Sequence, residues 1–221
     1  MNDFSTSDTS LATLLLRQLP DADDGAHDAA HIRRVWANVR AITAVEGGDP
    51  DILLAATLLH DCVHVEKSSP LRAQASRMAA SRAREILATI GWDELRIDRV
   101  AHAIAAHSFS AGIKPESLEA RILQDADRLD AIGCVGIARC FYTAGRMGSA
   151  LYHTEDPAAL SRELNDAAYA LDHFRAKLLN LHDGFQTQTG ARLAAERTRV
   201  LTDFVTSFET EIGADDDVWQ S

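Results

Sequence analysis

The sequence predicts an all-α protein formed by a single helical bundle. In most segments apolar residues recur every three or four positions, which is the spacing of a helix that buries one face. No segment of useful length alternates apolar and polar residues as a strand does, and neither an internal repeat nor a low-complexity tract is present. The 221 residues, 46% of them hydrophobic, are enough for one substantial core.

Residues that begin or end helices divide the first half of the chain. Pro20, the Gly- and Pro-containing residues 47–50, the loop 67–70 and Gly91 are such boundaries. Between them the apolar spacing predicts helices over residues 9–19, 27–46, 51–59 and 71–90.

The second half continues the same pattern. Apolar residues predict helices around 97–104 and 118–129, and over 161–182 and 190–212, whereas four glycines leave residues 131–155 without a clear pattern. We expect residues 1–24 to form an N-terminal helix and an acidic loop, residues 25–212 the main domain, and residues 213–221 an acidic tail.

Charge and cysteine content narrow the classes of partner and compartment. The net charge of −11, from 22 basic and 33 acidic side chains, disfavours nucleic acid and anionic membranes as partners. A phosphorylated substrate would need a metal ion or a few Arg and Lys side chains. Cys62, Cys134 and Cys140 form no C-x-x-C motif, and no apolar run is long enough to span a membrane. We therefore expect a cytoplasmic protein without a membrane segment.

Residues 51–59, which are apolar except for one acid and one hydroxyl, are followed by the pair His60 and Asp61. Burying both side chains is costly unless a cation or hydrogen bonds meet them, so the pair is either a set of metal ligands or an ordinary solvent-facing helix end. Three other pairs could contribute ligands: His27 and His31, His102 and His107, and Asp125 and Asp127. Each pair alone also fits an ordinary role, such as a helix cap, a core histidine or an ion pair with a neighbouring arginine.

Together these residues follow the order His, His-Asp, Asp over about a hundred positions. This order resembles the H…HD…D signature of the HD-domain metal-dependent phosphohydrolase superfamily. Residues 31–35, 58–61, 103–108, 125–133 and 173–179 are similar to its YedJ-like bacterial branch, and the similarity covers roughly residues 25–210. The resemblance implies the metal ligands His31, His60, Asp61 and Asp127. Asp127 is preferred to Asp125 because residues 126–129 resemble the ligand-bearing run of the related guanosine-polyphosphate hydrolases.

The resemblance also implies a chemistry. A divalent ion (Mn, Mg, Co, Fe or Zn) would activate a water that attacks a small phosphate ester or a nucleotide. Relatives place an acid at the third position after the His-Asp pair. His64 stands there, so His64 or Glu66 is a candidate general base, with a solvated loop residue as the alternative.

His107, at a predicted helix end, is a candidate phosphate donor or second-metal ligand, and His102 a candidate core histidine. Arg128 and Lys177 lie in stretches that resemble the family and are candidate phosphate-binding residues, whereas salt bridges explain Arg72 and Arg139 at least as well.

Two other functions remain open from the sequence. An HD-type di-iron oxygenase would use further histidines between the His-Asp pair and the last Asp, and a non-catalytic regulator would keep the fold but bind a ligand or partner. The sequence makes no prediction of the oligomeric state.

Overall fold

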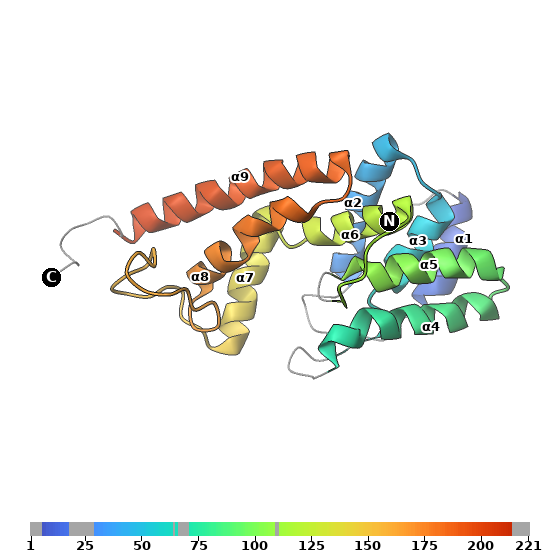
Figure 1. The fold of residues 1–221 in the computed structure, drawn as a ribbon, viewed down its shortest axis with the longest axis horizontal. Coiled ribbons are helices and arrows are strands. Elements are labelled where there is room, and N and C mark those ends of the chain that lie inside the picture. Colours follow the sequence, from blue (N-terminus) through green and yellow to red (C-terminus); the bar gives the residue numbers. More distant parts are fainter. Residues whose placement is uncertain (1–5, 18–28, 64, 66–70, 109–110, 214–221) are drawn as a thin grey trace. The chain divides into compact units, whose positions relative to one another are not determined.

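The computed structural model describes residues 6–17, 29–63, 65, 71–108 and 111–213. Within these ranges the regular structure is helical, apart from an isolated parallel bridge between Ala150 and Tyr169 (Figure 1). The predicted all-α fold is confirmed. The helices are α1 (Thr6–Leu16), α2 (Ala29–Glu46), α3 (Pro50–Leu59), η1 (Arg72–Gln74), α4 (Ala75–Thr89), α5 (Glu94–His107), α6 (Leu118–Leu129), α7 (Gly133–Met147), α8 (Ala170–Ala176), η3 (Leu178–Gly184) and α9 (Gln188–Glu211).

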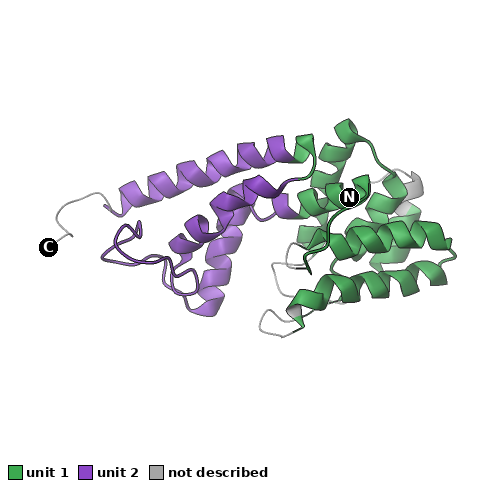
Figure 2. Cartoon of the chain, viewed as in Figure 1, with its two compact units in different colours: residues 1–127, 186–190 green, residues 128–185, 191–221 purple. Residues whose placement is uncertain are grey.

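The chain divides into two compact units (Figure 2). Unit 1 comprises Met1–Asp127 and Gln186–Gly190, and unit 2 comprises Arg128–Phe185 and Ala191–Ser221. The boundary therefore falls within α6 and within α9. The domain boundaries predicted after residues 24 and 212 stay predictions.

Helix α3 is the core of unit 1, since every residue from Ile52 to Leu59 is buried. Asp49 begins the helix by accepting hydrogen bonds from the N–H groups of Asp51 and Ile52, at 3.1 and 3.3 Å, and Pro50 occupies the first turn. Helices α1, α2, α4 and α5 pack against it, and α4 and α5 lie side by side (Figure 1). The end of α3 is thereby held inside the unit.

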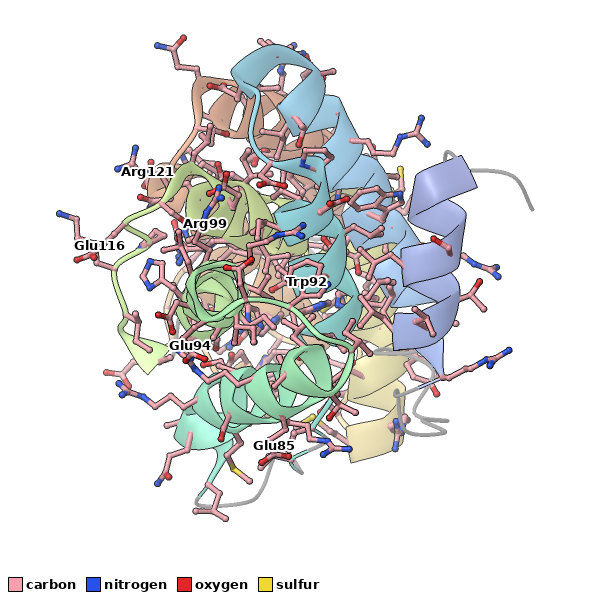
Figure 3. All side chains as sticks on the ribbon, turned by 90° about the vertical axis from the view of Figure 1, so that its right-hand side faces the viewer. Glu85, Trp92, Glu94, Arg99, Glu116 and Arg121 are labelled. Atoms are coloured by element: carbon pink, nitrogen blue, oxygen red, sulfur yellow. The ribbon has the colours of Figure 1, made fainter. Side chains whose placement is uncertain are left out.

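An ion-pair network fixes the start of α3. The buried carboxylate of Glu119, on α6, accepts from the Asp49 N–H at 3.1 Å and from Arg99 Nη2 at 2.9 Å. Arg99, labelled in Figure 3, also donates to Asp49 Oδ2 at 3.3 Å. Helices α3, α5 and α6 are therefore connected at this end by charge-assisted hydrogen bonds.

Most predicted helices match the structure, and three segments differ. The predicted helix 71–90 begins as the short helix η1, and the glycine-rich residues 133–147 form α7. The prediction of one helix over residues 161–182 is wrong, because α8 begins only at Ala170 and η3 follows it. The predicted loop 67–70 and all of the acidic tail after Gly213 lie outside the described residues, as does the stretch 18–28.

The late start of α8 has its cause in hydrogen bonds within unit 2. The fully buried carboxylate of Asp172 accepts two hydrogen bonds from Arg162, at 2.5 and 2.7 Å, and one from the Asn165 N–H at 2.7 Å. Residues 162–165 are thus folded back onto the first turn of α8 instead of extending it. Unit 2 is otherwise held by an aromatic cluster in which Phe141 lies 5.8 to 5.9 Å, centroid to centroid, from Phe174, Phe204 and Phe208.

Candidate metal centre

Three helices of unit 1 bring four of the predicted ligands together. His31 lies on the buried face of α2, His60 and Asp61 follow the last residue of α3, and Asp127 lies near the end of α6. His31 Nε2 is 3.2 Å from His60 Nε2, 3.4 Å from Asp127 Oδ1 and 3.8 Å from Asp61 Oδ2. His60 Nε2 is 3.6 Å from Asp61 Oδ2 and 4.0 Å from Asp127 Oδ1.

Hydrogen bonds to the backbone orient two histidine rings. His60 Nδ1 lies 2.7 Å from the Thr57 carbonyl oxygen, and His107 Nδ1 lies 2.6 Å from that of Ile104. A carbonyl only accepts, so each Nδ1 carries the proton, and the neutral ring then presents an Nε2 lone pair. Histidines that ligate metals are held in this way.

His107 joins a second group of candidate ligands. Its Nε2 is 3.9 Å from Asp61 Oδ1, and its ring centroid is 5.1 Å from that of His60. His60 therefore belongs to two sets, one with His31 and Asp127 and one with Asp61 and His107. Asp61 also lies 3.8 Å from His31 of the first set. Burial, followed by repulsion from His60, lowers the pKa of His107 below its ordinary value, which favours the neutral ring whose Nε2 lone pair a metal contact requires.

The burial pattern suits a cation site with one open side. His31 and His60 are each 1% exposed, whereas the side chains of Asp61 and Asp127 are 37% and 28% exposed. Two imidazoles with converging nitrogens and two nearby carboxylates repel one another without a positive charge between them. The donor set fits a divalent metal ion, with accessible coordination positions on the carboxylate side.

Asp125 faces a different part of unit 1. Its fully buried carboxylate accepts from the N–H groups of Gln186 and Thr187, both at 2.8 Å, and from Thr187 Oγ1 at 2.7 Å. These bonds hold the beginning of α9, where Gly190 leaves room for the carboxylate that a side chain would overlap. Asp125 is therefore engaged with the backbone, and Asp127 is the acid of this pair that lies beside the histidines.

The remaining candidates are distributed as follows. His27, His64 and Glu66 lie outside the described residues, so a role for His64 or Glu66 as general base stays a prediction. His102 is not a core histidine in the predicted sense, because it is half-buried and its Nε2 accepts from the Glu116 N–H at 3.0 Å. Arg139 forms a salt bridge of 2.7 Å with the buried Asp130, as the alternative for this residue predicts.

The two candidate phosphate-binding residues belong to unit 2. Arg128 is half-buried and donates a hydrogen bond to the carbonyl oxygen of Gly184, and Lys177 is exposed directly after α8. Their contact with a substrate stays a prediction.

Two buried amides next to the centre were not recognised in the sequence. Asn38 Nδ2 donates to the Ala126 carbonyl oxygen at 2.9 Å, and Gln124 Nε2 donates to that of Ala106 at 2.7 Å. The available signal was a polar residue inside the apolar face of a predicted helix, which a folded protein keeps only where it finds a partner.

No described helix combines the length and apolar character that a bilayer crossing requires.

Comparison with known proteins identifies the fold and the family. The model of the HD domain matches residues 28–132. YpgQ from Bacillus subtilis is 37% identical over 198 residues, which are 88% of each chain.

Solved structures agree with this match. A crystal structure of YpgQ in complex with ADP has a TM-score of 0.70 at 33% identity, covering 92% of this chain and 94% of YpgQ. An HD-superfamily hydrolase from Bacillus thuringiensis has a TM-score of 0.72 at 30% identity, covering 94% and 97%. With the His, His-Asp and Asp residues gathered in unit 1, the chain belongs to the HD domain family.

Proposed function

We propose that this protein is a metal-dependent phosphohydrolase that acts on a small phosphate ester, most favourably a nucleotide. The observation that carries the proposal is the convergence of His31, His60 and Asp127, with Asp61 within 4 Å of both histidines; the two rings are buried and the two carboxylates are accessible. Similarity to an HD-superfamily hydrolase supports the reaction class.

The chain's own residues would divide the work. His31, His60, Asp61 and Asp127 would hold the ion, and the Thr57 carbonyl would keep His60 Nε2 directed at it. A divalent ion held there would lower the pKa of a water molecule and offset negative charge on the phosphoryl group. His107, whose Nδ1 is fixed by the Ile104 carbonyl, would ligate a second ion through Nε2 when neutral, or would donate from a protonated Nε2 to the substrate phosphate or the leaving oxygen.

The substrate class rests on two considerations. The net charge of −11 repels anions at long range, so the phosphate must be held at short range by the ion and by a few basic side chains. YpgQ has been crystallised with ADP, which supports a nucleotide as the ligand for this chain as well.

Phosphate release tests the proposal. The purified protein is loaded separately with Mn²⁺, Mg²⁺, Co²⁺, Fe²⁺ and Zn²⁺ and assayed against nucleoside mono-, di- and triphosphates and simple phosphate esters. Activity is expected with at least one ion and is expected to vanish in the double variant His60→Ala, Asp61→Ala. His102→Gln is the matched control for His107→Gln, because both residues are on α5 but only His107 lies beside His60. Retention of stoichiometric metal by the double variant would exclude this centre.

The second group favours one alternative. With His60 Nε2 on the first ion, Asp61 Oδ1 and His107 Nε2, which lie 3.9 Å apart, would remain for a second ion, as an HD-type di-iron oxygenase would need. Two irons per chain with no phosphate release would favour the oxygenase, and a purified protein that binds no metal would favour a non-catalytic regulator.

A further inference from the structure

We propose that Asn38 is a positioning residue of the metal centre, which sets the separation of His31 and Asp127 by joining α2 directly to α6. The inference rests on the proposed metal centre and extends it to a residue that touches neither ion nor substrate. Its basis is the buried hydrogen bond from Asn38 Nδ2 to the carbonyl oxygen of Ala126, at 2.9 Å.

The position of Asn38 along α2 connects it with His31. The two residues are seven positions apart, which is about two helical turns, so both fall on the same face of the helix. That face is buried and continues through Val35 and Ile42. A shift or rotation of α2 that moved the ring of His31 would therefore also move the amide of Asn38.

The acceptor lies directly beside the other ligand. Ala126 precedes Asp127 on α6, and Asp127 Oδ1 is 3.4 Å from His31 Nε2. The helices α2 and α6 are thus in contact at two points, through the candidate ligands His31 and Asp127 and through the amide of Asn38. With both points fixed, neither helix can turn about its axis without breaking one of them.

Apolar packing alone would not fix the separation of His31 and Asp127. Hydrophobic contact is non-directional, whereas metal–ligand distances tolerate only about 0.2 Å of variation. A buried hydrogen bond between an amide and a carbonyl is directional and is lost by a small displacement. Asn38 is 6% exposed, so water does not readily replace the carbonyl as its partner.

The neighbouring amide provides a matched control. Gln124 is a buried residue of α6 whose side-chain amide, like that of Asn38, donates to a helix carbonyl, here that of Ala106 at 2.7 Å. Its bond joins α6 to α5 beside His107, and α5 carries none of the four predicted ligands of the first ion. Loss of this bond should reduce stability in the same way without changing the separation of His31 and Asp127.

Cobalt binding measures the effect. Co²⁺ is titrated into the metal-free full chain, and its visible absorption spectrum reports both the dissociation constant and the coordination geometry. Variants Asn38→Leu, which keeps the size and removes the donor, and Asn38→Ser, which keeps a polar group, are compared with Gln124→Met. Urea unfolding of each metal-free variant measures the purely structural loss.

We expect both Asn38 variants to bind Co²⁺ about tenfold more weakly and with an altered spectrum, since outer partners of metal ligands typically contribute 10- to 100-fold to affinity. The Co²⁺ dissociation constant of Gln124→Met should stay within about threefold of the wild-type value. Unchanged Co²⁺ affinity in the folded Asn38 variants, or an equal loss in Gln124→Met, would overturn the inference. A wild-type protein that binds no Co²⁺ would overturn the metal centre together with it. A wild type that binds Co²⁺ but hydrolyses no phosphate ester overturns only the proposed function.

Discussion

Asp125 and Asp127 are two residues apart, but replacing one or the other by asparagine should have opposite effects on stability and on metal affinity. Asp125 is fully buried and accepts three hydrogen bonds from Gln186 and Thr187, whereas Asp127 is partly exposed beside His31. We expect Asp125→Asn to lower the stability of the metal-free protein and to leave metal affinity nearly unchanged. We expect Asp127→Asn to do the reverse.

The cost of Asp125→Asn follows from its partners. An asparagine oxygen can keep the two donors of Thr187, which share Oδ2, and the amide nitrogen then faces the Gln186 N–H. One hydrogen bond to a carboxylate is lost, worth about 1.5–3 kcal/mol, and the remaining two weaken with the loss of charge. The expected destabilisation is about 3 kcal/mol, or about 6–12 °C in Tm for a chain of this length.

Two measurements on the same two variants separate the roles. Urea or thermal unfolding of the metal-free proteins gives the stability, and titration with Co²⁺ or Mn²⁺ gives the affinity. Because Asp127 is partly exposed, Asp127→Asn should change the free energy of unfolding by less than about 1 kcal/mol. Its metal affinity should fall at least about 100-fold, since it removes a ligand rather than a partner of one. Loss of metal by a folded Asp125→Asn protein, with metal retained by Asp127→Asn, would refute this reasoning and make Asp125 the ligand.

Three further perturbations test other parts of the chain. Chelation of an ion present at a hundred times its dissociation constant should remove about 2.7 kcal/mol of stability, and calorimetry that finds the same Tm with and without chelator would argue against an occupied site. In the folded state the pKa of His107 is lowered by burial and by His60. The unfolded chain therefore takes up the proton first, and the stability contributed by neutral His107 is lost as pH falls below about 6.5. The metal-free His107→Gln protein should lose less stability between pH 7 and 5 than the metal-free His102→Gln protein does. Arg162→Met leaves the buried Asp172 without its ion-pair partner and should cost about 3–5 kcal/mol in urea unfolding, part of which the added change Asp172→Asn should recover.

The helices of unit 1 were predictable because the residues that define each helix lie within it or directly before it in the sequence. In residues 51–59 the apolar run and the preceding Asp49 and Pro50 define both the burial and the start of α3. The failure at residues 161–169 has a different origin. There Asp172 binds Arg162 and the Asn165 N–H, so a polar partner ten positions away outweighs the apolar spacing that predicted a helix through this segment.

The candidate centre shows the same distinction between local and distant information. Order along the chain and family resemblance indicated His31, His60, Asp61 and Asp127, and the folded chain brings these side chains together. Helical geometry placed Asp125 and Asp127 about 200° apart without indicating what either would meet. The partners of Asp125 lie about sixty residues later, and His31 lies about a hundred residues before Asp127.

Burial separates the two acids in a way that sequence order does not. A carboxylate removed from water must have its oxygens satisfied by the protein, and Asp125 meets this condition with backbone and hydroxyl donors. An acid that serves a catalytic ion must instead leave a side of that ion open to water and substrate. Asp61 and Asp127, at 37% and 28% exposure above two buried imidazoles, meet that second condition. The fully buried aspartate is therefore the structural acid, and its partly exposed neighbour is the candidate ligand.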